Sequence, residues 1–98
     1  MKVRLPHNLE PAEVRRRLEE RKGEIVSYFP EGMASLDSRW KGEDHMDFVV
    51  AIAGQRIKGS VDIAEDHVVI DVNLPLILSF LNSKIESSVR KEGTRLLT

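Results

Sequence analysis

Apolar and polar residues alternate across the middle of the chain, and this pattern limits the folds that the chain can adopt. From Met33 onward it forms four short runs, at residues 34–40, 45–53, 55–63 and 67–74. Neighbouring side chains of a strand point to opposite faces, so each run is typical of a strand with one apolar and one polar face. The polar turns between the runs are short, which predicts an antiparallel meander.

Elements of a different kind flank this meander. Residues 1–5 alternate and stop at Pro6, which predicts a short strand at a sheet edge. A helix is expected from Pro11 to Tyr28, and Pro75 opens a second one. The apolar stripe of the first helix is Val14, Leu18, Ile25 and Phe29, and that of the second is Leu74, Leu78, Leu81, Ile85, Val89 and Leu96.

The expected fold is therefore an α+β domain with the element order β-α-β-β-β-β-α. It contains a five-stranded, mainly antiparallel sheet with two helices on its apolar face. With only 98 residues, the chain has room for a single domain, residues 1–98, with one core.

Composition excludes several classes of protein. The chain has no cysteine, which excludes disulfides, a thiolate nucleophile and Cys-ligated zinc. Net charge is +1 for residues 1–31, −4 for residues 32–74 and +2 for residues 75–98, so the strongly basic face of a nucleic-acid binder is missing. No stretch resembles a signal peptide or a membrane span, and we expect a soluble, cytoplasmic protein.

The histidines are the main candidates for chemistry. Glu-Asp-His occurs twice, at residues 43–45 and 65–67. Adjacent strand residues point to opposite faces, so carboxylate and imidazole are not expected to converge, and turns and strand starts explain both copies. A further role of His45 and His67 stays open. His7 is expected to hydrogen-bond to the backbone of a turn.

Catalytic motifs are not found elsewhere in the sequence. The glycines form no nucleotide-binding loop, and the serines of the last helix form no nucleophile elbow. We therefore predict a protein that is not an enzyme and that holds no metal and no cofactor.

The start of the last helix is the candidate binding site. Leu76, Ile77 and Phe80 lie off the apolar stripe, so apolar residues encircle this first turn. Either the turn packs against both the sheet and the first helix, or it forms a patch for a partner, lipid-like material or a second subunit.

Several short motifs together suggest a family. They are His7-Asn8-Leu9, Trp40-Lys41-Gly42-Glu43-Asp44 with Phe48, Gly59-Ser60-Val61, and Val68-Val69-Ile70-Asp71-Val72 leading into Leu74-Pro75-Leu76. In pattern and spacing, over nearly the whole chain, they resemble the polyhydroxyalkanoic acid system proteins. That resemblance implies a small bacterial protein associated with polyhydroxyalkanoate granules, and it carries no catalytic residue.

Three hypotheses for function follow. The first is a non-enzymatic accessory protein that contacts a granule surface through Leu76, Ile77 and Phe80. The order of elements also looks like a small helix-grip fold, so the second is a carrier of an apolar ligand. Its cleft would lie near Trp40, Phe48 and Leu81, where the core residues compete for the space. The third is a homodimeric scaffold.

Overall fold

A five-stranded sheet with two helices on one of its faces makes up the structure, a computed structural model that describes residues 1–28, 34–52 and 54–98. The strands are β1 (Lys2–Pro6), β2 (Ser35–Trp40), β3 (His45–Ile52), β4 (Gln55–Ile63) and β5 (His67–Asn73). The helical elements are α1 (Pro11–Arg21), η1 (Lys22–Tyr28), η2 (Leu76–Leu81) and α2 (Asn82–Leu97), where η denotes a 3-10 helix. This arrangement confirms the predicted α+β class and order of elements.

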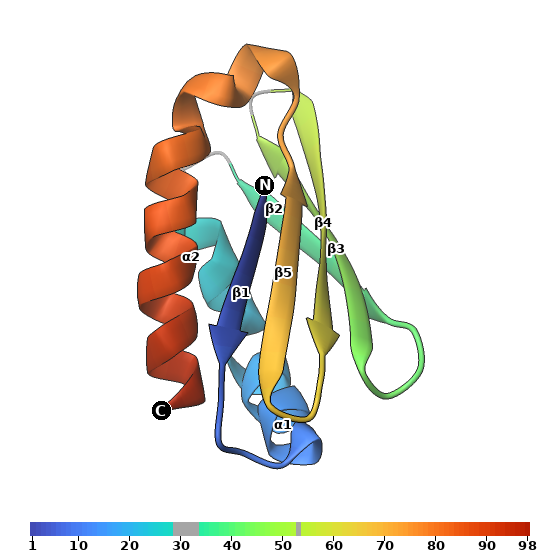
Figure 1. The fold of residues 1–98 in the computed structure, drawn as a ribbon. Coiled ribbons are helices and arrows are strands. Elements are labelled where there is room, and N and C mark those ends of the chain that lie inside the picture. Colours follow the sequence, from blue (N-terminus) through green and yellow to red (C-terminus); the bar gives the residue numbers. More distant parts are fainter. Residues whose placement is uncertain (29–33, 53) are drawn as a thin grey trace.

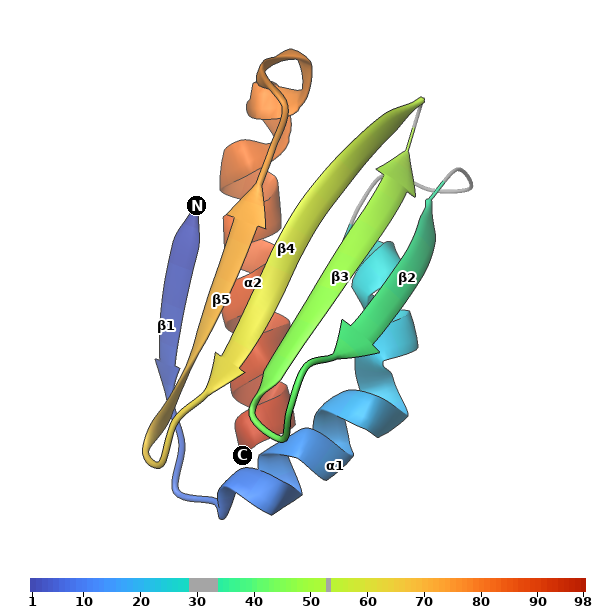
Figure 2. The ribbon, with the colours of Figure 1, turned by 90° about the vertical axis from the view of Figure 1, so that its right-hand side faces the viewer.

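The sheet is antiparallel at every pairing, in the spatial order β1-β5-β4-β3-β2. β1 lies at one edge, as the short run ending at Pro6 predicts. Helices cover one face, and the other face is open (Figures 1 and 2). Charged and polar side chains of the strands therefore share the open face.

The core lies between the sheet and the helices, where the predicted apolar faces meet. Val14 is fully buried, and Leu18 packs at the edge of the core, as the stripe of the first helix predicts. The buried apolar side chains of the strands are Val3, Leu5, Met46, Phe48, Val50, Ile52, Ile57, Val61, Ile63, Val68 and Val72. The buried apolar side chains of η2 and α2 are Leu78, Leu81, Ile85, Val89 and Leu97.

The first helix is shorter than expected. The α-helix ends at Arg21 and continues as the 3-10 helix η1, whereas the periodicity predicts one helix to Tyr28. Gly23 lies at this change, where the low helix preference of glycine favours the tighter turns that often end an α-helix. Phe29 and the side chain of Ile25, two members of the predicted stripe, lie outside the described part of the chain.

The last helix differs from expectation at both ends. It begins as the 3-10 helix η2, and near its C-terminus Leu97 is buried while Leu96 is only half-buried. Arg17 donates a hydrogen bond of 2.9 Å to the carbonyl of Leu96, so α1 lies against this end of α2. Leu97 is therefore buried at the end of α2 that faces α1, although it lies off the predicted stripe.

Trp40, the last residue of β2, contacts two residues of α1. The guanidinium of Arg15 stacks 4.2 Å from the ring centre of Trp40, and the Trp40 indole donates a 2.7 Å hydrogen bond to Glu19. Trp40 is half-buried and packs against the core, as its place on the apolar face predicts.

Among the described residues, no helix is long and apolar enough to cross a membrane.

Candidate functional site

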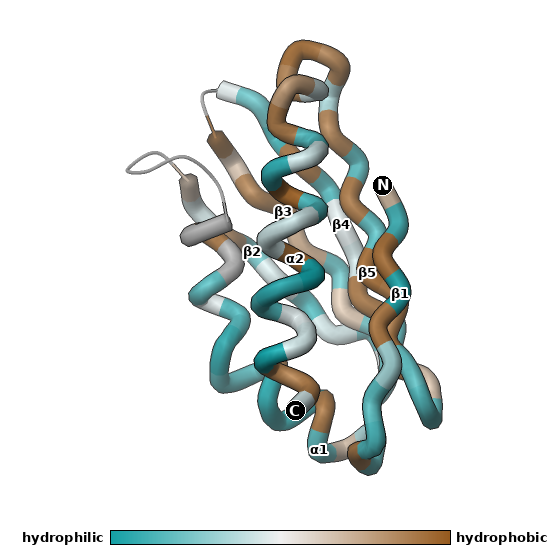
Figure 3. The backbone as a smooth tube through the Cα atoms, turned by 60° about the vertical axis from the view of Figure 1, so that its left-hand side comes forward, coloured by the Kyte–Doolittle hydropathy of each residue, from teal (hydrophilic) through white to brown (hydrophobic). Residues whose placement is uncertain are grey.

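An exposed apolar turn stands at one end of the molecule. Leu76, Ile77 and Phe80 are 91%, 68% and 76% exposed, and we name these three side chains the apolar tip. η2 lies beyond the ends of β1 and β5, and its backbone is coloured as hydrophobic in Figure 3. The alternative in which these residues pack against the sheet and first helix is therefore wrong.

Local geometry explains why the tip points outward. Pro75, in an extended conformation, precedes the turn, and the Leu78 amide donates a 2.9 Å hydrogen bond to the Pro75 carbonyl. A 3-10 helix has three residues per turn, so side chains three apart share one side. Leu78 and Leu81 share the buried side, whereas Ile77 and Phe80 share an exposed one.

The segment that contains the tip has no charged residues. From Val72 to Ser83 the chain has no charged residue, although 32% of all its residues are charged. An uncharged run of this kind does not show exposure by itself, because a buried segment has the same composition. The structure shows that this run is exposed at the apolar tip, because η2 extends past the ends of β1 and β5.

The residues of the predicted ligand cleft do not come together. Phe48 lines a cavity of about 60 Å³ between the sheet and the helices, but Trp40 and Leu81 do not line it. Side chains of Leu18, Val61, Ile70, Ile85 and Val89 supply much of the apolar lining. Sites for small molecules begin at about 300 Å³, so this cavity is several times too small for one. A hollow of about 370 Å³ on the open face of the sheet is also lined by Phe48, together with polar residues such as Asp47 and Lys58, and Trp40 and Leu81 do not line it either.

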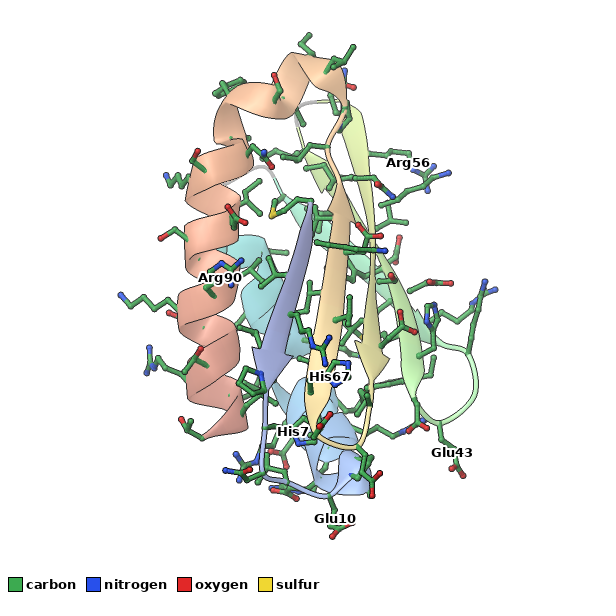
Figure 4. The ribbon with its side chains drawn as sticks, in the orientation of Figure 1. His7, Glu10, Glu43, Arg56, His67 and Arg90 are labelled. Carbon is green, nitrogen blue, oxygen red and sulfur yellow. The ribbon has the colours of Figure 1, made fainter. Side chains whose placement is uncertain are left out.

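His7 has a structural role in the loop after β1. Its side chain is buried, with Nε2 2.9 Å from the carbonyl oxygen of Ala64, and Nδ1 accepts a 3.1 Å hydrogen bond from the Leu9 amide. This ring therefore connects the β1–α1 loop to the β4–β5 turn (Figure 4). The expected hydrogen bonding of His7 to the backbone is confirmed.

His67 differs from expectation. Its Nδ1 lies 2.6 Å from Asp66, although neighbouring residues of a strand would diverge. Asp66 belongs to the turn before β5, so strand alternation does not apply to it. The imidazole lowers the pKa of the Asp66 carboxyl by hydrogen bonding to it.

His45 lies between two carboxylates on the open face of the sheet. Nδ1 contacts Asp62 of the neighbouring strand β4, and Nε2 lies 2.7 Å from Asp47. These hydrogen bonds, Asp62 first, raise the pKa of His45, because both carboxylates favour the imidazolium. Both ring nitrogens are thus engaged, and among the described residues no group of three or more His, Asp or Glu is arranged to hold a metal.

This arrangement predicts a pH-dependent stability. A raised pKa in the folded state means that His45 stabilises the fold fully below its unfolded pKa of about 6.5, and that this contribution is lost as pH rises through the folded pKa. We expect the urea midpoint of unfolding to fall over that range. The fall should be smaller in His45→Gln and in Asp62→Asn. Parallel curves for the wild type and both variants would contradict this role of His45.

Comparison with known proteins adds the family. The model of the family described as "Putative polyhydroxyalkanoic acid system protein" matches residues 1–97. The chain belongs to this family. No curated protein and no solved structure matches the chain. The match confirms the resemblance to the polyhydroxyalkanoic acid system family that the sequence motifs indicate.

Proposed function

We propose that this protein is a non-enzymatic accessory protein that docks on the hydrophobic surface of polyhydroxyalkanoate granules through its apolar tip. One observation carries the proposal: Leu76, Ile77 and Phe80 form a protruding surface of large apolar side chains that the fold itself leaves in solvent. Membership of the polyhydroxyalkanoic acid system family supports the granule as the surface that covers them.

Burial of apolar area supplies the driving force. Taking a Leu, Ile or Phe side chain out of water is worth about 1.5–3 kcal/mol, from which the cost of immobilising the protein is subtracted. Leu78 and Leu81 hold the turn in place from beneath, so little further ordering is needed on docking. Docking of this kind requires no catalytic group.

The alternative of a ligand carrier has less support. The cavity of about 60 Å³ next to Phe48 is mostly lined by side chains that also form the core. Enlarging it would remove contacts that hold the helices to the sheet. Surface docking, in contrast, uses side chains that the core does not need.

Sedimentation with isolated granules tests the proposal. We expect Ile77→Asp combined with Phe80→Asp to weaken partitioning on the order of 100-fold or more, because two of three docking side chains become charged. The matched control is Ser87→Asp combined with Thr94→Asp, which adds the same charge at exposed positions of α2. This control should partition within about twofold of the wild type, since its positions lie outside the tip.

Two further measurements separate the explanations. Ile77→Ser with Phe80→Ser removes apolar area without adding charge, and it should also lose binding. Unchanged partitioning of either folded tip variant, checked by circular dichroism, would refute the proposal. Light scattering that shows a stable wild-type dimer, converted to monomers by the tip substitutions, would instead assign the tip to a second copy of the chain.

A further inference from the structure

Basic residues gather at the end of the sheet that carries the apolar tip. Lys58 pairs in register with Asn73, the last residue of β5. Arg56 lies two residues before Lys58 in β4, level with the chain that leads into η2 (Figure 4). Lys84 lies in the first turn of α2, directly after η2. These three cations come from different parts of the sequence and lie around one end of the fold, Arg56 and Lys58 on the open face of the sheet and Lys84 on the helix that covers the other face.

The start of β1 adds to the same group. Lys2 pairs in register with Asp71, and the ammonium of Met1 donates a 2.9 Å hydrogen bond to the carbonyl of Val72. We name the exposed side chains of Lys2, Arg56, Lys58 and Lys84 the basic collar.

Ion pairing distinguishes the basic collar from most other cations of the molecule. Within the described residues, none of its four side chains forms an ion pair. In contrast, the cations Arg16, Arg17, Arg21, Lys22, Lys41, Arg90 and Arg95 each lie within 4.0 Å of a carboxylate. The charges of the collar are thus available to a partner without breaking an internal contact.

The turns at the opposite end of the molecule are acidic. These turns, at residues 7–10, 41–44 and 64–66, contain one basic residue, Lys41, and five acidic ones. Figure 4 shows two of the acidic ones, Glu10 and Glu43, at the end away from η2. The acidic turns and the basic collar therefore lie towards opposite ends of a molecule whose longest extent is 37 Å. The helix α1, beside the turns, carries four arginines and three glutamates and so leaves the turns the main source of negative charge there.

We propose that the apolar tip and the basic collar together dock the protein on an anionic phospholipid layer, with the long axis of the molecule upright on it. The inference rests on the proposed function in taking the tip as the docking site, and it adds the chemistry of the surface. The tip enters the boundary between headgroups and acyl chains, while the collar lies at the level of the phosphates.

Charge complementarity favours an anionic lipid over a neutral apolar surface. A neutral surface would gain nothing from unpaired cations, and it would dehydrate some of them on contact. An anionic layer attracts each Lys or Arg near it and repels the acidic end, so the charge separation orients the molecule before the tip inserts.

Vesicle cosedimentation tests this inference. The wild type should bind vesicles of phosphatidylcholine and phosphatidylglycerol more strongly than vesicles of phosphatidylcholine alone, and added salt should weaken only the first interaction. Arg56→Gln with Lys84→Gln should lower binding to the anionic vesicles about 25-fold, since each charge near the surface contributes about fivefold. The matched control is Arg39→Gln with Lys91→Gln, which removes two exposed cations outside the collar and should change binding within about twofold.

Equal binding to both kinds of vesicle would overturn the inference, as would an equal loss in the control variant. Vesicle binding that survives Ile77→Asp with Phe80→Asp would also overturn it. Failure to bind vesicles together with tip-dependent binding to bare polyhydroxyalkanoate beads would refute the lipid inference and leave the proposed function standing. All the substituted residues are exposed, so we expect each variant to fold, and circular dichroism is the check.

Discussion

Leu78→Ala is expected to lower the free energy of unfolding by about 3 kcal/mol, whereas Leu76→Ala should change it by less than about 0.5 kcal/mol. The two leucines lie two residues apart in η2. Leu78 is 7% exposed and packs in the core, so its truncation leaves a cavity under the turn. Leu76 is 91% exposed and loses almost no contact.

Urea denaturation of the two variants checks this difference. The difference matters for function because it separates the η2 side chains that hold the turn in place from those that are free to dock. Equal destabilisation by both substitutions would mean that Leu76 is packed in solution, and it would remove the apolar tip as a free surface.

Gly59→Val is expected to destabilise the fold by about 3 kcal/mol through overpacking. Gly59 pairs in register with Phe48, and the Phe48 ring lies over the position where a side chain would begin. A Cβ built on Gly59 would lie 2.6 Å from the ring carbon Cε2 of Phe48 and 2.8 Å from the carbonyl oxygen of Asp71. The ring is buried and the carbonyl belongs to β5, so neither can move away freely.

Thermal and urea unfolding measure this effect, and the neighbouring residue supplies a control. Ser60→Val introduces the same side chain on the open face of β4, where a β-branched residue suits a strand and should cost little. Phe48→Leu makes room and should recover part of the loss in the double variant. A Gly59→Val protein as stable as Ser60→Val would show that the Phe48 ring does not occupy this space.

Much of the fold follows from local pattern. Alternation from Met46 to Ile52 and from Ile57 to Ile63 indicates both the strands and their buried faces, because strand side chains have a period of two. The short turns fix the antiparallel order. Hydrogen bonding of His7 to the backbone was also predictable, since a His-Asn pair in a turn has few other uses.

Other features depend on how elements that are remote in the sequence are placed relative to one another, which local pattern does not show. Periodicity shows that Ile77 and Phe80 lie off the buried stripe, but exposure depends on whether sheet or helix reaches that far. The contact of His67 with Asp66 depends on the geometry of a turn, to which strand alternation does not apply.

The basic collar, too, could not be predicted from local sequence pattern. Lys2, Arg56 and Lys84 are far apart in the sequence. The register of β1, β4 and β5 brings the first two to one end of the sheet, and η2 returns the chain so that Lys84 at the start of α2 lies at the same end. Net charge summed along the chain conceals this group, because the acidic turns of the strands lie in the same segment as Arg56. Three-dimensional separation of charge was therefore not predictable from the composition of segments.

In the proposed docking, the apolar tip contacts the granule surface while the opposite end of the molecule faces water. Since the chain has no cysteine, single substitutions can carry a polarity-sensitive fluorophore at one chosen place. With the label on Ser79→Cys, within η2, we predict a blue shift of emission when granules are added. With the label on Glu43→Cys, at the far end, we predict no shift. Equal shifts at both positions, or a shift at Glu43→Cys alone, would contradict docking through the tip.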